Sequence, residues 1–198
     1  NHTDVDRAVQ FVDEIVKICP VYYVTGNHEY WLEKSEYDEL MDGLIGAGVV
    51  ILDDQVVEIS RGDANFRLVG LDDRSLSDGT LGTLLNDQAG QKEETADNEN
   101  SEKKEFTVVL AHEPQYLARY AGTGVDLVLS GHAHGGQFRL PFVGGIVAPD
   151  QGFLPEYTAG EYYMNGTEMI VSRGLGNSVI PVRLFNYPEI VCVELVVK

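Results

Sequence analysis

The chain has 198 residues, of which 43% are hydrophobic, which suffices for a sizeable core and fits one compact domain over residues 1–198 better than two. Its 32 acidic and 14 basic residues give a formal net charge of −18, which argues against nucleic acid as a partner. The only cysteines, Cys19 and Cys192, lie among apolar residues, so we expect buried free thiols rather than a disulfide framework.

The first predicted helix covers Val5–Val16, where apolar residues recur at helical spacing. Thr3 and Asp6 form a capping pattern at its start, and Pro20 follows its end. The β-rich run Val21–Thr25 then predicts a buried strand that leads into a tight loop at residues 26–29.

A second helix is predicted from a cap at Ser35 to a stop at Gly46 and Gly48. Strand-like runs follow at 49–52, 56–59 and 66–71, with a turn at Asp53-Asp54 between the first two. Residues 86–105 are almost entirely polar and charged, so they predict a mobile acidic surface loop, which we favour over a specific docking segment.

The runs Thr107–Ala111 and Asp126–Ser130 predict two more core strands, with a short helix from Pro114 to Ala121 between them. Like the strand at 21–25, both lead directly into a histidine-containing loop. The carboxyl ends of parallel strands share one edge of an α/β sheet, where ligand sites gather. The sequence therefore predicts that these histidines converge.

The last quarter predicts β structure. Tyr162–Met164 and Met169–Val171 flank Asn165-Gly166, a strong hairpin signal, and Ile190–Val197 predicts a long terminal strand. Strand-helix alternation followed by hairpins indicates an α/β fold with two packed mixed β-sheets flanked by helices.

Four of the five histidines fall in the strand-end loops. A lone strand-end histidine is more often structural than a metal ligand, but a glycine-flanked cluster reverses that preference. Imidazole nitrogen and amide oxygen suit divalent Zn, Mn and Fe. The candidate ligands are Asn27, His112, His132 and His134.

Three motifs together resemble the calcineurin-like metallophosphoesterases: GNHE at 26–29, AHEP at 111–114 and GHAHGGQ at 131–137. Three segments within residues 140–183, LPFVGG, APDQG and SRGLGNSVIPVR, are similar to a bacterial branch with membrane-associated phosphodiesterases and UDP-2,3-diacylglucosamine diphosphatases. The resemblance covers essentially the whole chain and implies an αββα sandwich.

The resemblance also implies roles. Asn27, His112 and His132 would bind one metal ion, and His134 would bind a neighbouring ion. Two divalent ions (Mn, Fe or Zn), about 3.5 to 4 Å apart, would activate a bridging water. His28 would protonate the leaving oxygen.

Other polar residues carry competing interpretations. Glu29 either orients His28 without touching the metal or is a solvated loop carboxylate, and neither reading is preferred. Arg173 either contacts substrate phosphate or forms a structural salt bridge, which is at least as well supported. For Asp72 and Asp73, capping a turn is favoured over assisting a metal.

The resemblance further predicts Asp-x-His and Gly-Asp-x-x-Asp blocks upstream, and neither occurs in this sequence. Asp4 and Asp6 are better explained as acidic residues in the first turn of a helix. We therefore expect an N-terminally truncated chain that binds one ion weakly or none, with impaired hydrolysis.

The predicted function is metal-dependent hydrolysis of a phosphodiester or pyrophosphate bond in a phosphorylated small-molecule or lipid-linked substrate. The alternative is a catalytically silent protein-binding module, against which the retained His28 argues. Apolar residues at 138–154 could form a wall beside the metals, but core packing is the preferred reading. No apolar run approaches the about 18 residues that span a bilayer. We expect a location in the cytoplasm or peripheral to the inner membrane face, with membrane association through an upstream segment.

Overall fold

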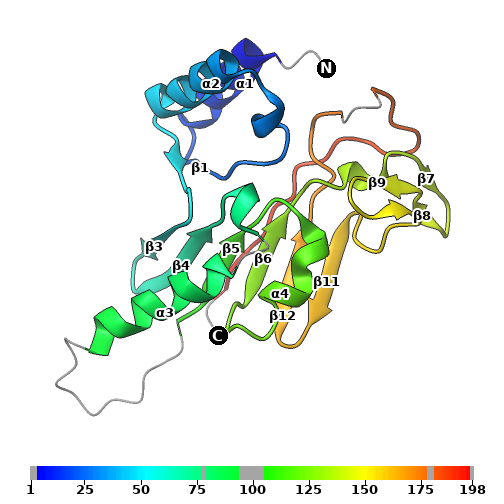
Figure 1. The fold of residues 1–198 in the computed structure, drawn as a ribbon. Coiled ribbons are helices and arrows are strands. Elements are labelled where there is room, and N and C mark those ends of the chain that lie inside the picture. The colour runs from blue at the N-terminus through cyan, green and yellow to red at the C-terminus, as the bar shows by residue number, and fades with distance from the viewer. Residues whose placement is uncertain (1–3, 77–78, 94–104, 178–180, 197–198) are drawn as a thin grey trace.

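The computed structural model describes residues 4–76, 79–93, 105–177 and 181–196 (Figure 1). They form an α/β fold in which helices flank a mixed sheet, as predicted. The α-helices are α1 (Val5–Ile15), α2 (Lys34–Ala47), α3 (Thr80–Glu93) and α4 (Leu117–Tyr120). Short 3-10 helices are η1 (Glu29–Trp31), η2 (Asp73–Ser75), η3 (Pro114–Tyr116) and η4 (His134–Gly136).

Among the described residues, one sheet has six strands in the order β11-β12-β6-β5-β4-β3. Its strands are β3 (Gln55–Arg61), β4 (Ala64–Gly70), β5 (Thr107–Leu110), β6 (Leu127–Ser130), β11 (Gly160–Met164) and β12 (Thr167–Val171). The four central strands are mutually parallel, whereas β3 and β11 pair antiparallel at the two edges. The carboxyl ends of β4, β5, β6 and β12 therefore meet at one edge, and β5 and β6 are direct neighbours there, as the sequence predicts.

A smaller parallel pair, β1 (Tyr22–Tyr23) and β2 (Val50–Ile51), packs on one face of the main sheet. Leu52, which follows β2, shares a buried cluster with Leu68 and Val108 of the main sheet. The approach is close: a Cβ atom at Gly70 would come within 2.2 Å of the Leu52 Cβ. α1 and α2 cover the other side of the pair around Leu44.

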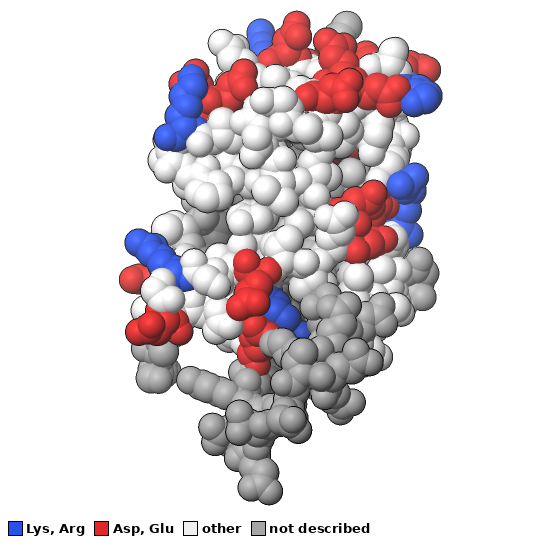
Figure 2. All heavy atoms as spheres, turned by 90° about the vertical axis from the view of Figure 1, so that its left-hand side faces the viewer, with Lys and Arg blue, Asp and Glu red and all other residues white. Residues whose placement is uncertain are grey.

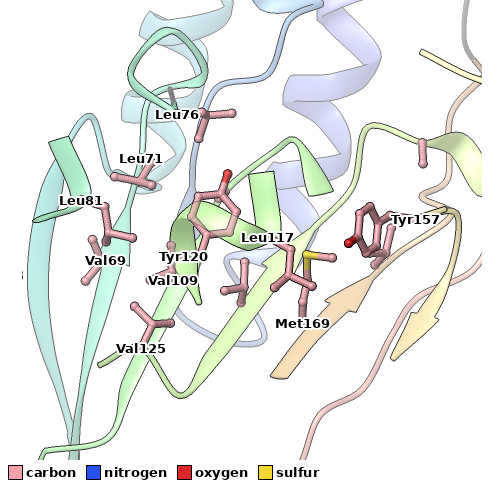
Figure 3. Packing of buried hydrophobic residues seen from close by; sticks show 14 of the residues in the cluster. Val69, Leu71, Leu76, Leu81, Val109, Leu117, Tyr120, Val125, Tyr157 and Met169 are labelled. Atoms are coloured by element: carbon pink, nitrogen blue, oxygen red, sulfur yellow. The ribbon is translucent and has the colours of Figure 1, made fainter. Parts of the chain in front are cut away.

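The opposite face of the main sheet carries the largest core cluster (Figure 3). Leu117 and Tyr120 of α4 point toward the strands, and Met169 of β12 lies beside Leu117. Leu81 of α3 closes the side over β4 near Val69. The sheet that bears the strand-end loops is therefore buried on both faces, which fixes the positions of those loops.

Two small antiparallel pairs lie beyond β11 and β12 at the right of Figure 1. They are β7 (Arg139–Leu140) with β8 (Gly144–Gly145), and β9 (Val147–Ala148) with β10 (Gly152–Phe153). Both follow the GHAHGGQ motif in sequence. β8 and β9 contact η4, so the hairpins lie beside the loop that follows β6.

Helix limits differ in part from the sequence prediction. Asp4 caps α1 through a bond from the Arg7 N–H, one residue after the predicted cap at Thr3, which lies outside the described residues; the carboxylate thus serves the start of the helix, as the sequence indicated. α2 is capped by Glu33 in a capping box with Glu36, so the predicted cap at Ser35 is wrong. A carboxylate accepts the free amide hydrogens of a first turn as well as a hydroxyl does.

Part of the predicted loop at 86–105 is helical, because α3 continues through Glu93. The apolar residues near Leu81 anchor the first part of α3 to the core. Gln, Lys and Glu are good helix formers, so the helix continues through the polar residues that follow. The loop prediction is therefore wrong for 86–93, and residues 94–104 lie outside the described part of the chain.

The predicted strand Ile190–Val197 is wrong over 190–196, where no strand forms, and Val197 lies outside the described residues. The segment faces β12 across a cavity of about 510 Å³, but β12 already pairs with β11 on one edge and β6 on the other, so it offers this segment no free edge. The prediction of buried thiols is also wrong: Cys19, just past α1, and Cys192, in this segment, are both free and exposed.

Acidic side chains gather around α1 and α2, at the top of Figure 2, and basic side chains are few on this face. No helix among the described residues is long and apolar enough to cross a membrane.

Candidate metal centre

The GNHE loop joins β1 to η1 and is closed on itself. The Glu29 carboxylate accepts a hydrogen bond from the Gly26 N–H at 2.7 Å, across the two residues that carry the predicted functional side chains. Glu29 therefore holds the backbone of the loop that presents Asn27 and His28, a role that neither of the sequence readings anticipated.

Donor atoms from this loop and from two others converge. The Nε2 atom of His112, just after β5, lies 3.1 Å from Asn27 Oδ1. The same nitrogen lies 3.1 Å from Nδ1 of His132, just after β6. We call Asn27 Oδ1, His112 Nε2 and His132 Nδ1 the donor trio. Ligands of one small divalent ion lie at about this separation, because each sits about 2.0 to 2.2 Å from the metal.

The backbone of the GHAHGGQ loop is unusual. His132 and His134 have φ angles of 59° and 47°, in the left-handed region that L residues rarely enter. The histidines thus share the left-handed conformation with the neighbouring Gly135 and Gly136. Glycine is required at position 136 for lack of space, because a Cβ atom there would come within 2.4 Å of the Gly145 Cα of β8.

A buried asparagine outside every motif anchors this loop. Asn186, 2% exposed, donates through Nδ2 to the carbonyl oxygens of His134 at 2.6 Å and Gln137 at 3.2 Å. Left-handed residues cost about 1 kcal/mol or more each, so the loop needs such external support. Sequence reasoning missed Asn186 because it lies 52 residues from His134 in sequence.

His134 lies close to His28. Their ring centroids are 5.8 Å apart, and His28 also stacks on Trp31 at 4.7 Å. The structure thus brings together Asn27, His112 and His132 as one group, and places His134 beside His28 as a second.

The buried imidazoles favour their neutral forms. Burial, with the neighbouring histidines, lowers the pKa of His112 from 6.5 to about 3 and that of His134 to about 4. Burial also lowers the pKa of His132, against the opposing effect of Asp150. At neutral pH the rings therefore retain the lone pairs that a metal requires.

Carboxylates with raised pKa values also lie near the imidazoles. Burial, then the charges of Asp73 and Asp150, raises the pKa of Glu113 to about 7. Burial, then the charge of Asp72, raises the pKa of Asp73 to about 6. Donor atoms of Glu113, His132 and Asp150 all lie within 4.8 Å of one another, which is close enough to hold a cation. The sequence analysis assigned no role to Glu113 or Asp150, although AHEP and APDQG contain them.

Asp72 ties the end of β4 to the GNHE loop. Its buried carboxylate accepts hydrogen bonds from the hydroxyls of Thr25, at 3.2 Å, and Tyr30. It also caps η2 by accepting from the Arg74 N–H at 2.8 Å, which agrees with the capping interpretation of this residue. Burial opposes its ionisation, but the bonds from Arg74 and Tyr30 hold its pKa below the usual value.

Arg173 follows β12 at the same sheet edge. Its Nε atom lies 3.4 Å from Glu189 Oε2, and its backbone N–H donates to the other carboxylate oxygen at 2.9 Å. This contact agrees with the salt-bridge interpretation of Arg173 and leaves phosphate binding without support in the geometry.

The apolar residues of 138–154 do not pack as a core. Five large apolar residues of this range are exposed: Leu140, Phe142, Val143, Phe153 and Leu154. The preferred core-packing reading is therefore wrong for these five. They lie on the β7–β8 and β9–β10 hairpins, and Asp150 lies in the turn of the second hairpin.

Comparison with known proteins places these features in context. The sequence model for "Calcineurin-like phosphoesterase" matches residues 1–136. An uncharacterized metallophosphoesterase of Aquifex aeolicus is 33% identical over 98% of this chain and 68% of its own length. The phosphodiesterase YaeI of Escherichia coli is 30% identical over 92% of this chain and 60% of its own length.

The uncharacterized metallophosphoesterase YkuE of Bacillus subtilis is 44% identical over a shorter stretch, which covers 43% of this chain and 29% of that relative. The chain thus spans between 29% and 68% of the length of these three relatives.

Proposed function

We propose that this chain, which belongs to the calcineurin-like phosphoesterase family, supplies metal ligands and an acid for the hydrolysis of a phosphodiester or pyrophosphate bond. The observation that carries the proposal is the donor trio. Three loops that are far apart in sequence bring an amide oxygen of Asn27 and an imidazole nitrogen of His132 each to 3.1 Å from the His112 Nε2 atom.

The donor set fits a divalent ion. Amide oxygen with imidazole nitrogen suits Mn, Fe or Zn, and both imidazoles have lowered pKa values that keep them neutral at pH 7. Bound divalent ions would lower the pKa of a water molecule and offset negative charge on the phosphoryl oxygens. In this proposal His134 is a ligand of a second ion, and the ion at the donor trio is the more tightly held because it has three protein ligands.

The chain's own contribution to bond cleavage is assigned to His28. It directly follows the ligand Asn27, and the Glu29 bond to Gly26 fixes the loop that carries both. Stacking on Trp31 restrains the ring. A histidine in this position can donate a proton to the oxygen that leaves as the phosphate ester breaks.

The exposed hairpins support a lipid-linked substrate. Phe142 and Phe153 are 110% and 73% exposed, and Phe142 lies in the left-handed region, where a buried contact would normally have to offset the strain. Between residues 138 and 149 the only charged side chain is Arg139. An apolar surface of low charge beside a phosphoesterase site suits a substrate with an acyl portion, and peripheral contact with the inner membrane face belongs to the same proposal.

The test is hydrolysis of bis(p-nitrophenyl) phosphate with Mn²⁺ by the chain and by His28→Ala. We expect His28→Ala to lower turnover by about 10²- to 10⁴-fold while Mn²⁺ affinity stays within about twofold. His2→Ala is the matched control, since this histidine lies outside the strand-end loops. Equal turnover in His28→Ala and His2→Ala would reject the assignment of His28.

A further inference from the structure

His132 makes two polar contacts through its two ring nitrogens, on opposite sides of the ring. Nδ1 belongs to the donor trio, at 3.1 Å from His112 Nε2. Nε2 lies 3.0 Å from the Asp150 carboxylate. The ring itself is buried, with a side-chain exposure of 1%, so these contacts determine where its single proton lies.

An ionised carboxylate has no proton to donate, so in this contact the His132 Nε2–H donates to Asp150. A neutral imidazole with its proton on Nε2 has its lone pair on Nδ1, the atom that faces the other two members of the donor trio. His112 differs, because among the described residues its Nε2 lies beside two acceptors, Asn27 Oδ1 and His132 Nδ1. In neutral His112 the proton must therefore move from Nε2 to Nδ1 before Nε2 can bind a metal, whereas His132 is already in the required tautomer.

We propose that Asp150 is a positioning residue of the metal centre, which holds His132 in the tautomer and ring orientation that direct Nδ1 toward the ion. The inference rests on the proposed function for the presence of the ion, but the hydrogen bond itself is a property of the chain. Carboxylates that accept the second N–H of a metal-binding histidine typically raise metal affinity about 10- to 100-fold.

The turn that presents Asp150 is braced. Gln151 accepts from the Tyr157 N–H and donates to the Tyr157 carbonyl oxygen, both at 2.8 Å, which closes the chain across six residues. Asp150 has a φ of 56°, a conformation that aspartate tolerates better than most residues. The brace supports the backbone that carries Asp150, whose side chain is 63% exposed and makes its contact with His132 from there.

A competing arrangement would use the same residues differently. Glu113, His132 and Asp150 could bind a cation directly, with both carboxylates as ligands. In that case His132 would have to present Nε2 as its ligand atom, and the donor trio would lose Nδ1. The two arrangements therefore predict different effects of Glu113, which the proposal leaves without a role in metal binding.

The experiment has two readouts on the full chain. The first is Zn²⁺ affinity, by competition with a chromophoric chelator at pH 7.5, for the wild type, Asp150→Ala, Asp150→Asn and Glu113→Gln. We expect Asp150→Ala to weaken binding about tenfold, at the lower end of the usual range because Asp150 is exposed. Asp150→Asn retains an acceptor oxygen and should weaken binding less. Asp63→Asn, which removes a charge from the exposed β3–β4 turn, is the control and should bind like the wild type.

The second readout is the His132 tautomer, from long-range ¹H–¹⁵N correlation spectra of the metal-free chain. We expect protonated Nε2 in the wild type and a mixture of both tautomers in Asp150→Ala. An unchanged tautomer, or a Zn²⁺ affinity of Asp150→Ala equal to that of Asp63→Asn, would overturn the proposal. Equal losses in Glu113→Gln and Asp150→Ala would overturn it in favour of direct carboxylate ligation. If the wild type binds no metal, the proposed function fails, and the tautomer still decides the role of Asp150.

Discussion

Gly26 lies directly against the imidazole ring of His112: a Cβ atom at position 26 would come within 2.8 Å of Cε1, Nδ1 and Nε2 of that ring. Real Cβ atoms essentially never approach so closely, so the first glycine of GNHE is required by a ring that lies 86 positions later in the chain. The two loops therefore support the donor trio by direct contact.

This contact makes Gly26→Ala a test of the metal centre that changes no ligand. We expect Zn²⁺ affinity to fall at least about tenfold, because the His112 ring must move out of the donor trio or the GNHE loop must shift. The matched control is Gly46→Ala within α2, where no atom lies within 4 Å of the added Cβ. That control should keep its affinity and gain about 0.5 to 1 kcal/mol of stability. Equal affinities for the two variants would contradict the role of the contact.

The metal-free chain should lose stability in acid through His112. Its folded pKa of about 3 lies below the ordinary 6.5, so the unfolded chain takes up a proton that the folded chain rejects. The free energy of unfolding that depends on neutral His112 is fully present above about pH 6.5 and is lost as the pH falls toward 3. His112→Gln should therefore lose less stability than the wild type between pH 7 and pH 5. The measurement is urea unfolding with chelator present, and identical losses in both proteins would reject the prediction.

Glu113 should have the opposite dependence. Its folded pKa of about 7 lies above the ordinary 4.5, so the folded state is penalised when the carboxylate is charged, at pH values above 7. Glu113→Gln should raise the melting temperature of the metal-free chain at pH 8. Discounted for partial exposure, the gain is on the order of 1 kcal/mol, or about 2 to 4 °C. At pH 4 the gain should become small, because the glutamate is then mostly protonated in both states. The glutamine introduced at position 113 keeps an oxygen that can accept the hydrogen bond from Gln115. Loss of that bond therefore does not confound the comparison.

Packing of α2 can be tested by two adjacent residues. Leu44 is 1% exposed and packs with Val5 and Leu40, whereas Ile45 is 61% exposed. Leu44→Ala should cost about 2 to 5 kcal/mol in free energy of unfolding, and Ile45→Ala should change it by no more than about 0.5 kcal/mol. Comparable losses, measured by urea unfolding, would mean that α2 packs differently.

The sequence predicts those parts of the metal centre that lie at the ends of strands. His112 and His132 each follow an apolar run, and the parallel order of β5 and β6 places them side by side. Asp150 and Asn186 could not be predicted in this way, because they reach the site from irregular segments whose path depends on tertiary contacts. The same limit applies to Ile190–Val196, whose residues favour strands but have no ladder partner among the described residues.

The exposed hairpins show a second limit. Hydrophobicity alone predicted burial for Phe142 and Phe153, and both are exposed. A pattern of apolar residues shows that a surface avoids water, but it does not distinguish an internal core from a surface that another molecule covers. The glycines and prolines around these residues instead indicate tight turns.

The most direct test of the account is the Zn²⁺ titration of the wild-type chain beside His112→Ala and His134→Ala, by calorimetry at pH 7.5. The donor trio predicts that the wild type binds one ion more tightly than any other, that His112→Ala loses this ion, and that His134→Ala retains it. Tight binding that survives His112→Ala, or that is lost only in His134→Ala, would contradict the assignment of the metal centre to Asn27, His112 and His132.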